Sequence, residues 1–269
     1  IMAVYVNTNV SSLNGRRYLN NVQNQLNTTY QRLSSGMRIN SAKDDAAGLQ
    51  IADRLTTQIN GLNQGNRNTN DGIALAQTIE GALDETSSML QKIRTLAVQS
   101  ANGTNTADDR KAIDTEAKAL QDEITRIAKQ TKFGGKTVLV GATAGSIYNT
   151  TSNPKGTVGQ LIFQVGANKG DEISFDVANF TFDGIHSQAG KNTAAFNNSN
   201  LILSTASGAK AVISLMDSMI AKVDAQRSGL GAIQNRLESS IRNQSNVSAN
   251  QADARSRIRD ADFAEESAN

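Results

Sequence analysis

Four stretches of the chain repeat apolar residues with the period of an α-helix. The first ends at Ser34-Ser35-Gly36, and its apolar residues lie alternately three and four positions apart, the spacing of a coiled-coil seam. The residues of this seam are Leu19, Val22, Leu26, Thr29 and Leu33. The other stretches run over about 42–100, 106–129 and from 205 past 250. The pattern predicts helices in all four, two of them much longer than the helices of ordinary globular domains.

Residues that favour helix ends flank these stretches. Gly36 can take the left-handed conformation that closes a helix. Asn40-Ser41 offers side-chain oxygens to cap the second helix. Thr106 with Asp109 resembles a capping box, with Asp in place of the usual Glu.

Between the third and fourth helical stretches the period falls from 3.6 to 2. Apolar residues alternate with polar ones at Leu161, Phe163 and Val165, and again at Ile173, Phe175 and Val177. Residues 166–171 lie between the two runs, so a β-hairpin is expected. Residues 179–200 are rich in Asn, Gly, Ser and Thr and show little periodicity, which predicts a surface loop.

The fold class that follows is mainly α, a long antiparallel helical bundle or coiled-coil rod built from both chain ends, with a small β-hairpin region. A last helix of some 45 residues would span about 68 Å. Isolated helices are marginal in water, so it needs apolar partners along its length. The helices of the first half of the chain are the partners available.

Composition excludes several kinds of chemistry. The chain has 27 basic and 25 acidic residues without a basic run, so we expect no nucleic-acid partner. There is no Cys and one His, His186, which excludes thiol catalysis, Cys-bound metals and the two-His zinc-protease motif. No secretory signal peptide and no apolar run of about 18 residues is present, so no membrane insertion is expected. We therefore predict no catalytic residues, no metal site, no cofactor and no enzyme activity.

Several segments resemble the signature sequences of bacterial flagellins. Residues 32–48 read RLSSGMRINSAKDDAAG, and residues 254–264 read ARSRIRDADFA. Residues 70–73, 93–102 and 164–168 are also similar to flagellin motifs, in the same order along the chain. The resemblance covers nearly the whole chain except about 179–204.

The resemblance implies a structural subunit that self-assembles into the flagellar filament for motility and is secreted to the cell exterior. It implies helical homo-oligomers, with a flagellar export chaperone and a cap protein as partners. The implied regions are a terminal inner core over 1–45 and 258–269, an outer-core helical rod over 46–178 and 200–257 with its hairpin at about 138–178, and a short variable outward-facing loop over 179–199. The expected assembly interface comprises Leu19, Val22, Leu26, Arg32, Leu33, Ile39, Arg255 and Ile258.

Flagellins continue beyond the stretch that ends here at residue 269 by about one more amphipathic helix, on the order of 30 residues. From the resemblance we expect that, without this helix, the N-terminal helix lacks its partner and the 269-residue chain does not polymerise.

A second implication of the resemblance concerns immunity. Lys92, Leu96 and Glu116 match flagellin positions contacted by the vertebrate Toll-like receptor that senses flagellin. Lys92 and Leu96 are four residues apart and share a helix face. An ordinary exposed Lys–Glu pair is the alternative interpretation.

Two other functions are compatible with parts of the sequence. A hook–filament junction protein would share the paired terminal helices. A cell-surface module that binds glycans through residues 141–204 is the other alternative, with hairpin core as the competing interpretation of its aromatic residues. Those residues are Tyr148, Phe163, Phe175, Phe180 and Phe182.

Overall fold

The computed structural model describes residues 9–148, 158–190, 192–197 and 200–268. The chain divides into two compact units. The terminal unit comprises 1–63 and 244–269, and the central unit comprises 64–243. Two long helices, α2 (Ala46–Ala101) and α5 (Ala206–Arg259), contribute residues to both units.

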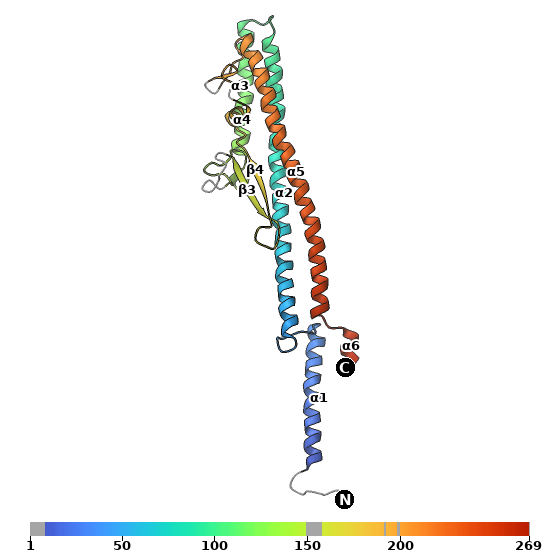
Figure 1. The fold of residues 1–269 in the computed structure, drawn as a ribbon. Helices are drawn as coiled ribbons and strands as arrows, with labels where there is room; N and C mark the ends of the chain where they lie inside the picture. Colours follow the sequence, from blue (N-terminus) through green and yellow to red (C-terminus); the bar gives the residue numbers. More distant parts are fainter. Residues whose placement is uncertain (1–8, 149–157, 191, 198–199, 269) are drawn as a thin grey trace. The chain divides into compact units, whose positions relative to one another are not determined.

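In the central unit α2 and α5 lie side by side and run in opposite directions (Figure 1). Arg94 pairs with Asp217 at 2.6 Å, and Arg227 pairs with Asp84 at 2.9 Å, so rising numbers on one helix meet falling numbers on the other. Between them lies a core of apolar side chains that are almost completely buried. From α2 and α5 it includes Ile79, Leu83, Leu90, Ile93, Met216, Met219, Val223 and Leu230. This apolar stripe and the mainly α fold class are as the sequence predicts.

The helix α3 (Ala107–Gln130) packs on the same core through residues that recur at helical spacing. They are Ile113, Ala117, Ile124 and Ala128. The predicted capping box is present: the Thr106 hydroxyl accepts from the Asp109 amide, and the Asp109 carboxylate accepts from the Thr106 amide at 2.9 Å.

The predicted hairpin is formed by β3 (Gly159–Gln164) and β4 (Glu172–Val177), with Leu161 opposite Phe175. Gly72 on α2 lies close to it: a Cβ there would be 3.3 Å from both the Phe163 ring and the Leu237 side chain. A residue without a side chain therefore lets the hairpin and α5 approach α2 at this point. Two shorter antiparallel pairs complete the strands of the described residues, β1 (Lys132–Phe133) with β2 (Lys136–Thr137) and β5 (Phe196–Asn197) with β6 (Asn200–Leu201).

The prediction of a surface loop over 179–200 is wrong for much of that segment. Residues Phe182–Ala189 form the helix α4, which lies beside α3 (Figure 1). Thr181 caps its start, because the Thr181 hydroxyl accepts from the Gly184 amide. Phe180, Phe182 and Ile185 are at most 1% exposed and join the main core. The segment is polar in composition, and its helix has only two turns, in which Phe182 and Ile185 face the core, so a helical period does not stand out.

The start of α2 also differs from the prediction. The helix begins at Ala46, about four residues later than expected, because the Asp44 carboxylate accepts from the amides of Asn40 and Ser41 and holds them in a turn. Asp45 then caps the helix by accepting from the Gly48 amide at 2.9 Å.

The terminal unit contains α1 (Val10–Ser35), the first turns of α2, the last turns of α5 and α6 (Phe263–Ala268). As predicted, Gly36 ends α1 in the left-handed conformation, with φ of 68°. Gln251 and Arg255 of α5 donate to Gln58 and Thr56 of α2, so these two helices are antiparallel here also.

The capping box at α3 makes the stability of the central unit dependent on pH. The Thr106 hydroxyl and amide lower the pKa of Asp109 below its ordinary value of 3.8. A lowered folded-state pKa stabilises the native state above the unfolded-state pKa, and this stabilisation is lost as pH falls through the folded-state value. We expect Asp109→Asn to reduce the loss of stability below about pH 4, measured by urea unfolding at a series of pH values. Asp108→Asn, in the same turn but outside the capping box, is the control. An acid dependence of Asp109→Asn equal to that of the parent would contradict the prediction.

Candidate assembly surface

The helix α1 keeps its apolar side chains exposed. None of its 26 residues is buried. Of the predicted seam, Leu19 is 70% exposed, Val22 59% and Leu26 47%, whereas Leu33 near the end of the helix is half-buried. Large apolar side chains exposed in a row on one helix mark an interaction surface.

From Tyr18 to Leu33 the large apolar and aromatic side chains of α1 are concentrated on one side, whereas Val10 and Leu13 in the first turn lie outside this stripe. At 3.6 residues per turn, the seam residues fall within an arc of about 120°, with Tyr18 and Tyr30 at its two edges. Tyr18 is 74% exposed and Tyr30 62%. The stripe therefore has the width of a helix–helix contact, with amphipathic aromatic rings along its borders.

Main-chain hydrogen bonds hold the segment that follows α1 against the end of α5. We call residues 36–39 and 258–261 the terminal clasp. The Arg38 amide donates to the Arg259 carbonyl at 2.7 Å, and the Ala261 amide donates to the Gly36 carbonyl at 3.0 Å. Met37 and Asp260 form an antiparallel bridge between these segments.

Side chains reinforce the terminal clasp. Arg32 near the end of α1 pairs with Glu266 of α6 at 3.3 Å, and Glu266 is only 7% exposed. The Arg38 guanidinium donates to the Ile258 carbonyl at 2.8 Å. The structure thus brings α1 and α6 together through residues more than 200 positions apart in the sequence.

The predicted interface residues fall into two groups. Leu19, Val22 and Leu26 are exposed, and Leu33 is half-buried at the end of the same stripe. The other four make contacts inside the terminal unit. Arg32 forms the ion pair with Glu266, Ile39 is buried at 2% exposure, Arg255 donates to the Thr56 hydroxyl, and the Ile258 carbonyl accepts from Arg38 in the terminal clasp. The sequence pattern does not single out Glu266. No local signal could have identified it, because its partner is Arg32.

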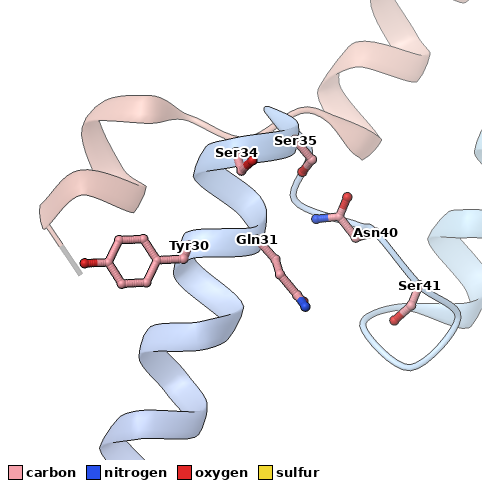
Figure 2. Close-up of a pocket in the computed structure, with 6 residues that line it drawn as sticks. All are labelled: Tyr30, Gln31, Ser34, Ser35, Asn40 and Ser41. Carbon is pink, nitrogen blue, oxygen red and sulfur yellow. The ribbon is translucent and has the colours of Figure 1, made fainter.

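An open groove of about 590 Å³ lies beside the end of α1. Figure 2 shows its lining: Tyr30, Gln31, Ser34 and Ser35 on the last turns of α1, and Asn40 and Ser41 on the following loop. The side chains that line the groove carry hydroxyl groups, amide groups and one aromatic ring. It contains no pair of groups suited to acid–base or nucleophilic catalysis.

The predicted receptor residues lie in the central unit. Lys92 and Glu116 form an exposed ion pair of 3.1 Å between α2 and α3. Leu96 is only 7% exposed and belongs to the main core. The structure therefore brings Lys92 and Glu116 together on the surface and turns Leu96 inward.

Chemistry elsewhere in the described part of the chain is limited. His186 is 8% exposed, packs against Phe196 with ring centroids 4.4 Å apart, and accepts from the Asn192 amide. Over the described ranges no three His, Cys, Asp or Glu residues are grouped so that they could hold a metal ion. In the same ranges every helix is too short or too polar to cross a membrane. The aromatic residues considered for glycan binding are core or partly buried: Tyr148, Phe163, Phe175, Phe180 and Phe182.

Long antiparallel helices and an exposed apolar seam define a structural protein of the helical, self-associating class. The family model of the bacterial flagellin N-terminal helical region matches residues 6–144, and that of the C-terminal helical region matches 213–269. The chain belongs to the bacterial flagellins. It is a structural subunit of the extracellular flagellar filament and serves motility; the family is not one of enzymes.

Individual relatives agree with the family assignment. The chain is 37% identical to polar flagellin C of Vibrio parahaemolyticus over 351 aligned positions, covering 98% of this chain and 91% of that one. It is 38% identical to flagellin E of Vibrio cholerae, with the same coverage. The crystal structure of Bacillus cereus flagellin is similar with a TM-score of 0.50 and 31% identity, over 66% of this chain and 88% of that one. A hook-associated flagellar protein of Vibrio parahaemolyticus shares the fold, with a TM-score of 0.61 and 20% identity, over 81% of this chain and all of that one.

The ion pair between Arg32 and Glu266 should hold α6 in place. In Arg32→Gln the buried Glu266 carboxylate loses its cation, which costs about 1–3 kcal/mol of local stability. We expect faster amide hydrogen exchange over 258–268, measured by mass spectrometry. The control is Asp253→Asn, which removes the exposed pair of Arg257 with Asp253 and should leave exchange in α6 as it was. Exchange in α6 that is the same in Arg32→Gln as in the parent would contradict the prediction.

Proposed function

We propose that filament subunits associate through the apolar stripe of α1. The observation that carries this proposal is a helix of 26 residues that buries none of them while exposing Leu19, Val22 and Leu26 at coiled-coil spacing. Each such side chain that a neighbour buries contributes roughly 1.5–3 kcal/mol. A helix that is marginal by itself is stabilised when a helix of another subunit covers this stripe.

The proposal extends to the regions of the filament. Residues 1–45 and 258–269 form the inner core, 46–178 and 200–257 the outer core, and 179–199 the outward-facing segment. The terminal unit, which extends to residue 63 and begins again at 244, supports a division between terminal and central parts. The alignment with polar flagellin C has 351 positions, whereas this chain has 269 residues, so the relative has residues that this chain lacks. This difference supports a short variable region.

An exposed apolar stripe must be shielded before assembly, because contiguous apolar surface promotes aggregation. This requirement supports two further partners. An export chaperone covers the subunit inside the cell, and a cap protein directs its addition to the filament.

The stripe can be tested with one charge on each side of α1. Val22→Asp places a carboxylate in the stripe, where assembly would bury it unpaired, so we expect few or no filaments. Asn24→Asp is the matched control, because two residues further along a helix is nearly the opposite side. Each substitution is introduced into the flagellin gene of the bacterium, electron microscopy of the cells measures the number of filaments, and circular dichroism of the purified subunits checks the fold. Filaments as numerous with Val22→Asp as with Asn24→Asp would sink the proposal.

We also propose that the exposed pair of Lys92 and Glu116 contacts the vertebrate Toll-like receptor that senses flagellin. The supporting observation is that two helices bring opposite charges together at the surface, 3.1 Å apart. Leu96, which also matches a receptor-contact position, is buried, so its contribution is to hold the α2 surface in place from beneath.

A reporter-cell assay can separate these residues. The double variant Lys92→Ala/Glu116→Ala should need roughly ten-fold more protein for a half-maximal response, as expected for the loss of about 1.4 kcal/mol at an interface. Its thermal stability should be nearly unchanged, because exposed pairs contribute little. Glu123→Ala/Arg126→Ala, which removes another exposed pair on α3, is the control. An unchanged response of the Lys92/Glu116 variant would contradict the proposal.

A further inference from the structure

The chain contains three Asn-Gly dipeptides, and they lie in different backbone settings. Asn14-Gly15 lies within α1 and Asn60-Gly61 within α2, where each glycine amide is part of the helical hydrogen-bond ladder. Asn102-Gly103 lies in the turn between α2 and α3. Within the described part of the chain the Gly103 amide donates no backbone hydrogen bond, and a Cβ at Gly103 would meet nothing within 4 Å.

Two groups donate to the backbone carbonyl of Asn102. The Arg110 guanidinium donates through Nη2 at 2.9 Å, and the Asn105 amide donates at 3.4 Å. This carbonyl and the Gly103 N–H belong to the same peptide unit. Donors on the oxygen draw electron density from the nitrogen and stabilise the anion that forms when the N–H loses its proton. The donation by Arg110 is charge-assisted and is the stronger of the two.

The side chain of Asn102 is held over the same peptide unit. Its Oδ1 accepts from the Thr104 amide at 3.4 Å, which closes a turn across Gly103 and restrains the side chain. A donor on Oδ1 also stabilises the negative charge that develops there when a nucleophile adds to Cγ. The nucleophile is the Gly103 nitrogen and the electrophile is Asn102 Cγ. One hydrogen bond polarises the carbonyl group bonded to this nitrogen, and another polarises the carbonyl group that contains Cγ.

We propose that the turn at Asn102-Gly103 is a self-activated deamidation site, with Arg110 as the residue that promotes the reaction. Hydroxide removes the Gly103 amide proton, the nitrogen forms a bond to Asn102 Cγ, and the side-chain nitrogen takes a proton from water and leaves as ammonia. Water then opens the five-membered succinimide at either carbonyl and gives aspartate or isoaspartate at position 102. One water is consumed and one ammonia released, and nothing is oxidised or reduced.

The product differs from the parent in charge and in backbone. Deamidation places a carboxylate next to the Arg110 guanidinium, and the isoaspartyl form adds one methylene to the main chain between α2 and α3. Asn102 and Arg110 belong to the central unit, whereas the apolar stripe of α1 belongs to the terminal unit.

Peptide mapping by mass spectrometry of the purified chain, kept at mildly alkaline pH, follows all three sites at once. We expect Asn102 to deamidate faster in the native chain than in the chain unfolded in guanidinium chloride. Asn60 should be slower in the native chain than in the unfolded one, because α2 restrains the Gly61 amide, and this site is the internal control for sequence and buffer. Asn14 lies in the uncovered helix α1 and should be slowed less than Asn60. A native rate at Asn102 equal to or below its unfolded rate would overturn the proposal.

Substitution of Arg110 tests its role. Arg110→Gln should slow the native reaction at Asn102 roughly three- to ten-fold, less than the ~10²-fold of a buried oxyanion hole because this turn is open to water. Arg110→Lys keeps the charge but not the guanidinium geometry and should be intermediate. Circular dichroism checks that α2 and α3 remain folded, and the rate in guanidinium chloride should be the same for all three chains. A native rate that rises in Arg110→Gln would show that Arg110 restrains the turn instead, and would overturn its assignment.

Discussion

The burial of one apolar stripe between α2 and α5 is the constraint on which the central unit depends. Neither helix could remain straight and folded in water alone at such a length, because helical hydrogen bonds barely exceed the entropy they restrict. Apolar side chains such as Leu83 of α2 and Met219 of α5 are buried in the core between the helices, so each helix shields the other from water. The helix α3, the hairpin and α4 then add to a pair that already exists, and each does so with apolar residues on one side only.

The terminal unit is organised on a different principle. Its longest element, α1, contributes no buried residue, and what holds its end is a set of main-chain hydrogen bonds and one ion pair. Main-chain bonds fix position without adding much apolar burial. The unit therefore keeps its apolar stripe available for other subunits, and a flagellin requires such a surface because it works only as part of a filament.

Residues close in sequence account for what could be predicted. The seam of α1, the capping box at Thr106 and the alternation of the hairpin are patterns with periods of a few residues, and the structure has all three. The segment around α4 was misread because eight residues are too few for a helical period to stand out against Asn, Gly and Ser. The start of α2 was placed too early because Asn40, Ser41 and Asp45 all resemble caps, and the hydrogen bonds of Asp44 decide among them. Arg32 and Glu266 could not be paired at all, since no short-range pattern relates positions so far apart. The same holds for Leu96, whose burial depends on which side of α2 faces α3 and α5.

The terminal clasp has a consequence for the order of events in folding. Residues 36–39 obtain their hydrogen-bond partners only from residues 258–261, near the opposite end of the chain. A loop of this length closes slowly, and no local contact can substitute for it. While the chain emerges from the ribosome or threads a narrow passage, residues 36–39 must therefore wait with their amides turned to water. The junction becomes rigid only after residues 258–261 have arrived, so its formation reports that both long helices, α2 and α5, have already been made.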